Sequence, residues 1–393
     1  MPDWWKNPFS CCTKEPPVGG KYTALEKGKG KAESSAGEDN DEAMWSRDLL
    51  PHAYGDFSIA AVQAGEHMED QSQVEASQNA TLVGVYDGHG GPDVSQYVCD
   101  NLFEHLQRLA LNDISITEEV IMNAFAATEE GFLGVVANTM GDNPAIATIG
   151  SCCLVGLIWQ GILYVANLGD SRAVMGYRDA NSKIQAERLT DHHNASVDEI
   201  REQLMITHPE DPEIVINKDT VWRVKGIIQV TRAIGDSYLK RPEFAAHPSL
   251  TKFQLKVPIQ RPVLRSDPSI VTRVIQQTPR FVIFASDGLW DHLSNEQAVD
   301  IVNSHPRNGI AKRLLVAALT NAAHKLGINY SDLKNFQKGT RRKLHDDTSV
   351  VVLYIDSATP RNFVNSAGLS IRAFSDSEGP SKFVVEGPVV ELK

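Results

Sequence analysis

Short apolar runs of strand length dominate the chain from residue 57 onward. They are rich in Val, Ile and aromatic side chains, which suit a pleated and largely buried surface. Polar and Gly-containing segments bound each run, as expected of turns and loops. The pattern predicts strands at 57–63, 81–86, 154–159, 162–167, 172–177, 281–286 and 349–355.

Segments with helical periodicity separate these runs. Two apolar stripes predict helices, because residues at such spacing lie on one helix face. The stripes are Val94, Val98, Leu102 and Leu106, followed by Ile121, Phe125, Phe132 and Val135. An Ala- and Leu-rich segment predicts another helix at 310–326. Ser196 with Glu199, and Ser294 with Gln297, have the spacing of capping boxes that begin helices.

One apolar segment, 145–168, is long enough to consider as a membrane-spanning helix, which needs about 20 residues. Gln160-Gly161 is a turn signal in its middle, between two runs of strand length. Asp170 and Arg172 follow directly. We therefore predict a buried β-hairpin here rather than a membrane span.

The predicted helices flank consecutive strands without a regular alternation of strand and helix. This order, with at least one hairpin, predicts the α+β class of layered fold. Residues 13–43 contain few large apolar side chains and cannot bury enough surface to offset the entropy of ordering. We expect a flexible arm at 1–52, one folded domain at 53–357 and a polar tail at 358–393.

The net charge is −12, from 38 Lys and Arg against 50 Asp and Glu. This balance argues against a nucleic-acid partner, because phosphate backbones require clustered basic residues. The 5 Cys residues show neither a disulfide framework nor CxxC spacing, which favours a reducing compartment. No apolar signal-peptide core stands near residue 1. We expect a cytoplasmic protein, with peripheral plasma-membrane or nuclear location as alternatives; acylation of Cys11 and Cys12 stays open.

Acidic residues stand next to several of the predicted strands. A carboxylate beside a buried strand is costly unless it is paired or binds a cation. A single Asp at such a place more often begins a turn. Several of them on separate strands favour one cluster that binds a hard divalent cation, Mg²⁺ or Mn²⁺. The residues are Glu69, Asp70, Asp87, Asp170, Asp287, Asp346 and Asp347.

The segment 87–91 reads Asp-Gly-His-Gly-Gly and directly follows a predicted strand. Glycine lets the backbone approach a ligand closely, so the Gly88 carbonyl is a candidate metal ligand beside Asp87. His89 is a candidate proton donor to a leaving oxygen. A single His is more often structural, and that interpretation stays open on these residues alone.

Together these segments resemble the metal-dependent PPM-type (type 2C) Ser/Thr protein phosphatases, over roughly residues 56–356. Each motif alone is weak, but their order and spacing are specific. A plant subfamily shares stretches similar to 235–244, 287–295 and 330–336. The motifs are Met68-Glu69-Asp70, Asp87-Gly88-His89-Gly90-Gly91, Asn167-Leu168-Gly169-Asp170-Ser171-Arg172, Arg232-Ala233-Ile234-Gly235-Asp236, Ala285-Ser286-Asp287-Gly288-Leu289-Trp290-Asp291 and Asp346-Asp347-Thr348-Ser349-Val350.

The resemblance implies a four-layer α/β/β/α sandwich, with two antiparallel sheets flanked by helices. It also implies hydrolysis of phosphoserine and phosphothreonine by direct attack of a hydroxide that bridges two Mn²⁺ or Mg²⁺ ions. Asp87 would bridge the two ions, and His89 would be the general acid. The other implied metal-binding residues are Gly88, Asp287 and Asp346 as direct ligands, Glu69 and Asp70 through water, and Asp170 and Asp291 at a weaker third ion.

One position departs from the family pattern. Relatives carry an Arg that grips the substrate phosphate three residues before the Met of the Met-Glu-Asp motif, and this chain has Gly65 there. A Gly cannot make a bidentate phosphate contact. Candidate substitutes are Arg223, Lys225, Arg341, Arg342 and Lys343, although the last three favour the interpretation of a solvated charged run.

Other enzyme classes fit the sequence less well. A tyrosine phosphatase needs an Arg six residues after its Cys, a P-loop enzyme needs GxxxxGK[ST], and the chain has neither. A catalytically impaired phosphatase fold that serves as a binding or regulatory module is the remaining alternative, indicated by Gly65 alone. Arg172 is expected to be a structural ion-pair partner rather than a substrate contact.

The resemblance further implies phosphoprotein substrates and a monomer. Members of the similar plant subfamily act on a plasma-membrane proton pump and are inhibited by small proteins. A proton pump and a small inhibitory protein are therefore expected partners of this chain.

The arm at 1–52 contains none of the motifs that carry the resemblance. Deletion of residues 1–50 is then expected to leave catalysis on a small phosphoester within about twofold of the full chain.

Overall fold

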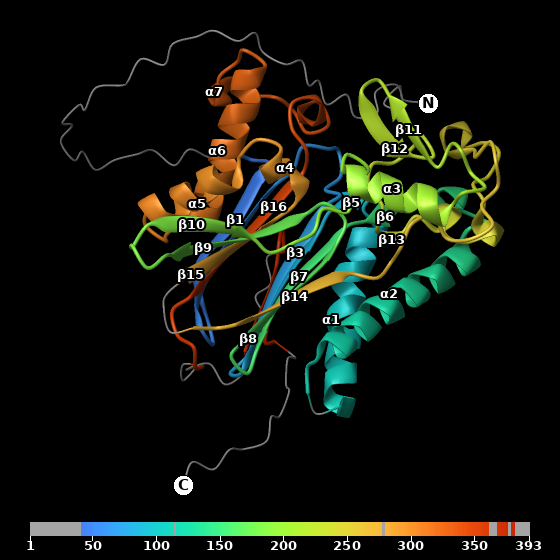
Figure 1. Cartoon of the computed structure of the whole chain (residues 1–393). Coiled ribbons are helices and arrows are strands. Elements are labelled where there is room, and N and C mark those ends of the chain that lie inside the picture. Colours follow the sequence, from blue (N-terminus) through green and yellow to red (C-terminus); the bar gives the residue numbers. More distant parts are fainter. Residues whose placement is uncertain (1–40, 114, 277–279, 361–367, 376–378, 382–393) are drawn as a thin grey trace. The chain divides into compact units, whose positions relative to one another are not determined.

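The computed structural model describes residues 41–113, 115–276, 280–360, 368–375 and 379–381. Two antiparallel six-stranded sheets pack face to face, and helices cover the outer face of each sheet (Figure 1). The α+β class and the four-layer α/β/β/α sandwich expected from the sequence are confirmed.

The first sheet joins strands from both ends of the folded region. Its order is β1 (Met44–His52), β2 (Gly55–Val62), β16 (Thr348–Ile355), β15 (Arg280–Ala285), β9 (Arg172–Arg178) and β10 (Ile184–Arg188). The central strands β2, β16 and β15 consist mostly of buried apolar residues, because both faces of the sheet are covered there.

The second sheet has the order β14 (Ser269–Val274), β8 (Ile162–Leu168), β7 (Cys153–Trp159), β4 (Ala80–Tyr86), β3 (Gln71–Ala76) and β17 (Leu369–Arg372). β7 and β8 are the predicted hairpin, and both turn residues, Gln160 and Gly161, have positive φ. The core between the two sheets includes Phe57, Ile59, Val83, Val85, Phe284 and Val351.

Helices α1 (Asp93–Asp113) and α2 (Glu118–Thr139) cover the second sheet. α5 (Asn295–Ser304) and α6 (Ile310–Lys325) cover the first sheet, together with the short helices α4 (Asp287–Trp290) and α7 (Tyr330–Leu333). Both predicted apolar stripes lie in the core that α1 and α2 form with the second sheet, although Val135 is only partly buried. The helix expected at 310–326 is confirmed as α6.

One of the two predicted capping boxes is present. Ser294 and Gln297 form it at the start of α5. The prediction at Ser196 is wrong, because α3 (Asp198–Thr207) has Val197 as its N-cap, without a side-chain hydrogen bond. The Ser196 N–H is instead held by the Asn194 side chain at 2.9 Å, so the chain turns before the helix begins.

Among the described residues, α2 is the helix that is long and apolar enough to cross a membrane, judged by length and composition. In its most apolar window, 50% of the residues are buried inside the protein. Ile121, Phe125 and Phe132 pack in the core shared with α1 and the second sheet. These contacts are those of a core helix of the sandwich.

The folded region begins earlier and ends later than predicted. β1 lies within the predicted arm and pairs with β2, and β17 lies within the predicted tail and pairs with β3. The boundaries at residues 52 and 358 are therefore corrected. Both strands lie at sheet edges and are only partly buried, so neither has the continuous apolar run that marks a central strand. The remainder of the predicted arm, 1–40, lies outside the described residues, as do parts of the predicted tail.

Between β10 and β14 the chain forms an insertion beside one edge of the sandwich. The insertion contains α3, the hairpin β11 (Val215–Lys218) and β12 (Val221–Val224), and β13 (Ile234–Gly235). β13 joins β6 (Gly150–Ser151) and β5 (Gly88–His89) in a small sheet with the order β13-β6-β5. This small sheet places His89 next to the acidic residues at the sandwich edge.

Candidate active site

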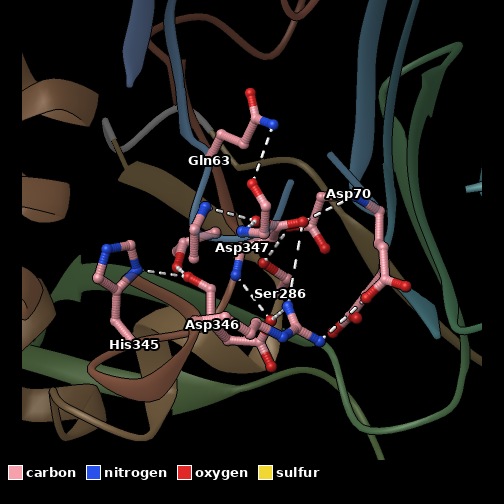
Figure 2. Close-up of polar contacts among 12 residues, drawn as sticks. Gln63, Asp70, Ser286, His345, Asp346 and Asp347 are labelled. Atoms are coloured by element: carbon pink, nitrogen blue, oxygen red, sulfur yellow. Dashed lines mark hydrogen bonds and ion pairs between the residues drawn. The ribbon is translucent and has the colours of Figure 1, made fainter. Parts of the chain in front are cut away.

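The predicted metal-binding carboxylates come together at one edge of the sandwich. β2, β4, β8 and β15 end at this edge and β16 begins there, because antiparallel pairing brings alternate strand ends together. Figure 2 shows part of this cluster, including Asp70, Ser286, Asp346 and Asp347. Asp291, directly after α4, is exposed at the rim.

Asp347 organises the loop between β2 and β3. Its carboxylate accepts hydrogen bonds from the backbone N–H groups of Ala64 at 2.6 Å, Gly65 at 3.1 Å and Glu69 at 2.7 Å. The Asp347 side chain is buried. Its three bonds hold Glu69 and the adjoining Asp70 at the sandwich edge. The sequence indicated Asp347 as a cluster member, but not this positioning role.

Ser286 connects the two central strands of the first sheet to Asp70. Its hydroxyl donates to Asp70 Oδ2 at 2.7 Å and accepts the N–H of Ser349 at 2.9 Å. Asp346 Oδ1 accepts the N–H of Asp347 at 2.6 Å. The Asp70 carboxylate is thus held by a hydroxyl donor, and the Asp346 carboxylate by a backbone donor (Figure 2).

Asp87 and Asp287 lie at the ends of β4 and β15, and the Asp287 N–H donates to Asp87 Oδ2 at 3.4 Å. Candidate ligand atoms of Asp87, Asp170 and Cys152 lie within 4.8 Å of one another. The Cys152 thiol donates to Asp170 Oδ1 at 3.3 Å. Sequence reasoning missed Cys152, because an apolar strand start gives no signal that its side chain meets the carboxylates.

Burial and mutual repulsion destabilise the ionised form of the carboxylates in this cluster. Burial raises the pKa of Asp87 well above its usual range, and the charge of Asp287 raises it further. Burial raises the pKa of Glu69 to about 7, although the Arg342 guanidinium opposes the change. Divalent cations relieve such repulsion, and the donor set is mainly carboxylate oxygen, which hard cations prefer. The residues present therefore fit bound Mg²⁺ or Mn²⁺.

Gly88 has no room for a side chain. A Cβ there would lie 2.4 Å from the Glu69 carbonyl oxygen and 2.9 Å from Ser95 Oγ. Only Gly permits this close approach of the backbone segments. The Gly88 carbonyl, a predicted ligand, therefore belongs to a backbone segment that packs closely against Glu69 and Ser95.

His89 pairs with a residue far away in the sequence. Its Nε2 lies 2.8 Å from Asp236 Oδ2, and the Asp236 side chain is buried. Burial alone would lower the pKa of His89, but the Asp236 carboxylate raises it above the ordinary value. Because an ionised carboxylate only accepts, Nε2 carries the shared hydrogen and Nδ1 is the second donor of the protonated ring. Asp236 was in a quoted motif but had no predicted role.

Arg342 is the cation that the structure brings to the cluster. Its Nη2 lies 3.0 Å from Glu69 Oε2, and its Nη1 contacts Asp346. At the position where relatives carry an Arg, a Cβ on Gly65 would lie 2.8 Å from the His67 carbonyl oxygen. A side chain at residue 65 would therefore require the backbone to shift. The interpretation of Arg342 as part of a solvated run is wrong.

The other candidate cations lie elsewhere. Arg341 is buried with Asp41, at 2.7 and 2.9 Å, and Lys225 pairs with Asp211. Arg223 donates to the Ile227 carbonyl at 3.1 Å. Lys343 is exposed.

Arg172 is structural, but its close contacts differ from the expected ion pair. Its Nη1 donates to Asn295 Oδ1 at 2.7 Å. Its guanidinium lies 5.1 Å from the ring centroid of Trp290. These contacts join the start of β9 to α4 and α5.

Comparisons with known proteins agree with this fold. Residues 59–327 match the family model described as Protein phosphatase 2C. Probable protein phosphatase 2C 25 of Oryza sativa subsp. japonica is 57% identical over 343 residues, 87% of this chain and 89% of that protein. Probable protein phosphatase 2C 68 of Arabidopsis thaliana is 54% identical over 352 residues, 88% of this chain and 89% of that protein.

Two solved structures share the fold. The serine-threonine phosphatase 2C from Toxoplasma gondii superposes with a TM-score of 0.51 at 18% identity, covering 79% of this chain and 98% of that chain. A C. elegans sex determining protein superposes with a TM-score of 0.54 at 18% identity, covering 79% of this chain and 66% of that chain. At this identity the structures show the fold alone.

The sequence matches define the class: the chain belongs to the protein phosphatase 2C family. It is a protein-serine/threonine phosphatase of the plant type. The family match ends at residue 327, so the placement of Arg342 and Asp346 at the site rests on the structure.

Proposed function

We propose that the acidic edge hydrolyses phosphoserine and phosphothreonine in proteins with two bound Mn²⁺ or Mg²⁺ ions. The observation that carries the proposal is the convergence of carboxylates from separate strands at one edge of the sandwich: the Asp287 N–H lies 3.4 Å from Asp87 Oδ2, and candidate ligand atoms of Asp87, Asp170 and Cys152 lie within 4.8 Å of one another. The proposed ligands are Asp87, the Gly88 carbonyl, Asp287 and Asp346, with Glu69 and Asp70 acting through water and Asp170 and Asp291 at a weaker third ion.

When bound, the cations would supply a hydroxide at neutral pH and neutralise charge on the phosphoryl oxygens. The chain itself supplies the proton and the phosphate contact. His89 Nδ1 would donate a proton to the leaving Ser or Thr oxygen, while Asp236 holds Nε2. Arg342 would bind phosphoryl oxygens with its planar guanidinium, in place of an Arg at residue 65.

Removal of divalent cations is expected to abolish phosphate release from a phosphothreonine peptide. Dialysis against EDTA should remove the activity, and added Mn²⁺ or Mg²⁺ should restore it in proportion to occupancy. Full turnover in metal-free buffer would contradict the proposed ligand set. A folded chain that releases no phosphate under any metal condition would instead favour the alternative of a binding module.

Arg342→Ala is expected to raise KM for p-nitrophenyl phosphate about tenfold at saturating Mn²⁺, with little change in kcat. A charge-assisted contact contributes about 1.5–3 kcal/mol, and about 1.4 kcal/mol corresponds to a factor of ten. Because a contact shared by ground and transition states affects KM alone, kcat should persist. Lys343→Ala, an exposed change in the same short segment, is the matched control.

Calorimetric titration with Mn²⁺ tests the opposite explanation for Arg342. If Arg342 only neutralises the carboxylates when no metal is bound, it competes with the metal. Arg342→Ala would then tighten Mn²⁺ binding and leave KM for p-nitrophenyl phosphate unchanged. That combination would refute the phosphate-binding role.

We further propose phosphoproteins as substrates, a plasma-membrane proton pump among them, and regulation by a small inhibitory protein. The support is the resemblance to the plant subfamily. A monomer that acts in the cytoplasm or at the plasma-membrane surface suits these partners. Phosphoproteomics after capture of substrates on an inactive Asp87→Asn variant would test the substrate assignment, and recovery of no membrane-pump phosphopeptide would overturn it.

A further inference from the structure

A buried ion pair connects α2 to the segment that carries Asp236. Lys240 Nζ lies 2.6 Å from Glu129 Oε1, and each side chain is 5% exposed. Glu129 Oε2 accepts the N–H of Gly235 at 3.0 Å, and Lys240 Nζ donates to the Ala233 carbonyl at 2.7 Å. The pair therefore holds the backbone on both sides of Ile234, in β13.

The contact between Asp236 and His89 crosses the small sheet β13-β6-β5. Asp236 directly follows β13, His89 lies on β5, and Gly150 on the middle strand pairs with both Gly235 and His89. A Cβ on Gly150 would lie 2.1 Å from Asp236 Oδ2 and 2.4 Å from His89 Nε2. The hydrogen bond thus passes directly over the Gly150 backbone, and its length depends on how β13 is placed against β5.

Asp236 itself needs outside support. Its φ is 47°, in the left-handed region that a non-Gly residue adopts only when its surroundings hold it there. The Asp236 N–H donates to the Ile149 carbonyl at 2.8 Å, and the Glu129 contact to Gly235 lies one residue before it. Ile149, directly before the middle strand, therefore holds Asp236 itself, and α2 holds the residue before it.

An apolar pair would pack α2 against this segment equally well. Replacing a buried ion pair by apolar residues is often neutral or stabilising, so stability alone does not explain the charges. The charged groups add specific hydrogen bonds that an apolar pair cannot make. They bind one N–H and one carbonyl of the backbone before Asp236 and so fix its position.

We infer that Glu129 and Lys240 are positioning residues for proton donation by His89. They fix the position of Asp236, and Asp236 holds His89 Nε2 by a hydrogen bond. The orientation of the ring is thereby fixed, with Nδ1 left to donate a proton to the leaving oxygen. A water-derived oxygen forms a bond to phosphorus as the bond from phosphorus to the Ser or Thr oxygen breaks. The electron pair of the broken bond passes to the Ser or Thr oxygen, which takes the Nδ1 proton. The inference rests on the proposed function, because it concerns the same reaction.

The choice of leaving group separates this role from a merely structural one. 4-Nitrophenolate leaves as a stable anion and needs little help from an acid, whereas the alkoxide of Thr requires a proton. Misplacement of His89 should therefore slow the phosphothreonine peptide much more than p-nitrophenyl phosphate. A general loss of folding or metal would slow both substrates alike.

The test compares kcat for the two substrates at saturating Mn²⁺. The main variant is the double change Glu129→Leu with Lys240→Met, which leaves no unpaired buried charge. Glu129→Gln is a second variant that preserves shape. Glu130→Gln is the matched control, because Glu130 and Arg241 join the same helix to the same segment through an exposed pair at 2.6 Å. His89→Gln sets the full effect.

We expect the ratio of kcat for p-nitrophenyl phosphate to kcat for the peptide to rise about tenfold in the double variant, with Glu130→Gln unchanged. His89→Gln should raise it by about a hundredfold, since general acids contribute roughly 10²–10⁴ in rate. Equal losses on both substrates, or a wild-type ratio in a folded double variant, would overturn the inference. A wild-type chain that hydrolysed neither ester would instead refute the proposed function.

Discussion

Asp87→Asn is expected to lower kcat/KM on a phosphothreonine peptide by about a thousandfold or more, while the chain stays folded. The substitution keeps the shape of the side chain but removes the charge that would hold both cations. Bound metal contributes several kcal/mol of transition-state stabilisation, and about 1.36 kcal/mol corresponds to a factor of ten in rate. Asp287→Asn should behave in the same way, because its carboxylate lies in the same repulsive cluster.

Thermal unfolding distinguishes this loss from misfolding. Asp87 is repelled by Asp287, Asp70 and Asp346. Asn at residue 87 removes that repulsion, so the metal-free variant should be at least as stable as metal-free wild type. The rise in unfolding temperature on adding Mn²⁺ should disappear. Asp142→Asn, an exposed change, is the control. Retention of more than a tenth of wild-type activity by Asp87→Asn would contradict the proposed metal site.

Asp41→Ala is expected to lower the free energy of unfolding by about 3–5 kcal/mol, as when one partner of a buried ion pair is removed. Both side chains of the pair between Asp41 and Arg341 are 1% exposed, and the contact is bidentate. Ala would leave the Arg341 charge buried without its carboxylate partner, beside His345 at 3.1 Å, and burial lowers the pKa of that His to about 4. Urea denaturation measures the change.

A control variant and two truncated proteins test whether the loss of stability comes from Asp41. Glu42→Ala changes the exposed neighbour of Asp41 and should alter stability little. Deleting residues 1–40 should preserve the unfolding midpoint, whereas deleting residues 1–50 should lower it, because the second deletion removes Asp41 and most of β1. Equal stability of the two truncated proteins would show that β1 and Asp41 contribute nothing to the folded domain.

The central strands could be predicted because burial on both faces imposes a continuous apolar run. β4, β7, β15 and β16 lie within one residue of the predicted ranges at each end. The edge strands β1 and β17 could not, since most of their residues are only partly buried and the pattern along the chain is weak. Their place in the sheets follows from pairing with β2 and β3, which the sequence of either segment does not reveal.

Arg341 and Arg342 show the same limit at the site. The residues are adjacent in a basic run, yet Arg341 is buried against Asp41 and Arg342 lies against Glu69 and Asp346. The distant acids cannot be read from the run itself: Asp41 lies about 300 residues before Arg341, and Glu69 lies about 270 residues before Arg342. Asp346, four residues after Arg342, is the one local acid of the three. Direction along a short helical turn decides which acid each meets.

The sequence by itself determined the fold class, the buried strands and the acidic residues at their ends. It could do so because an apolar run followed by a carboxylate has a cost that only a site or a turn removes. The tertiary structure decided which distant groups meet: Asp236 with His89, Arg342 with the acidic cluster, and Glu129 with Lys240. These partners are joined by strand order and helix packing, so only the folded chain brings their charges within hydrogen-bonding distance.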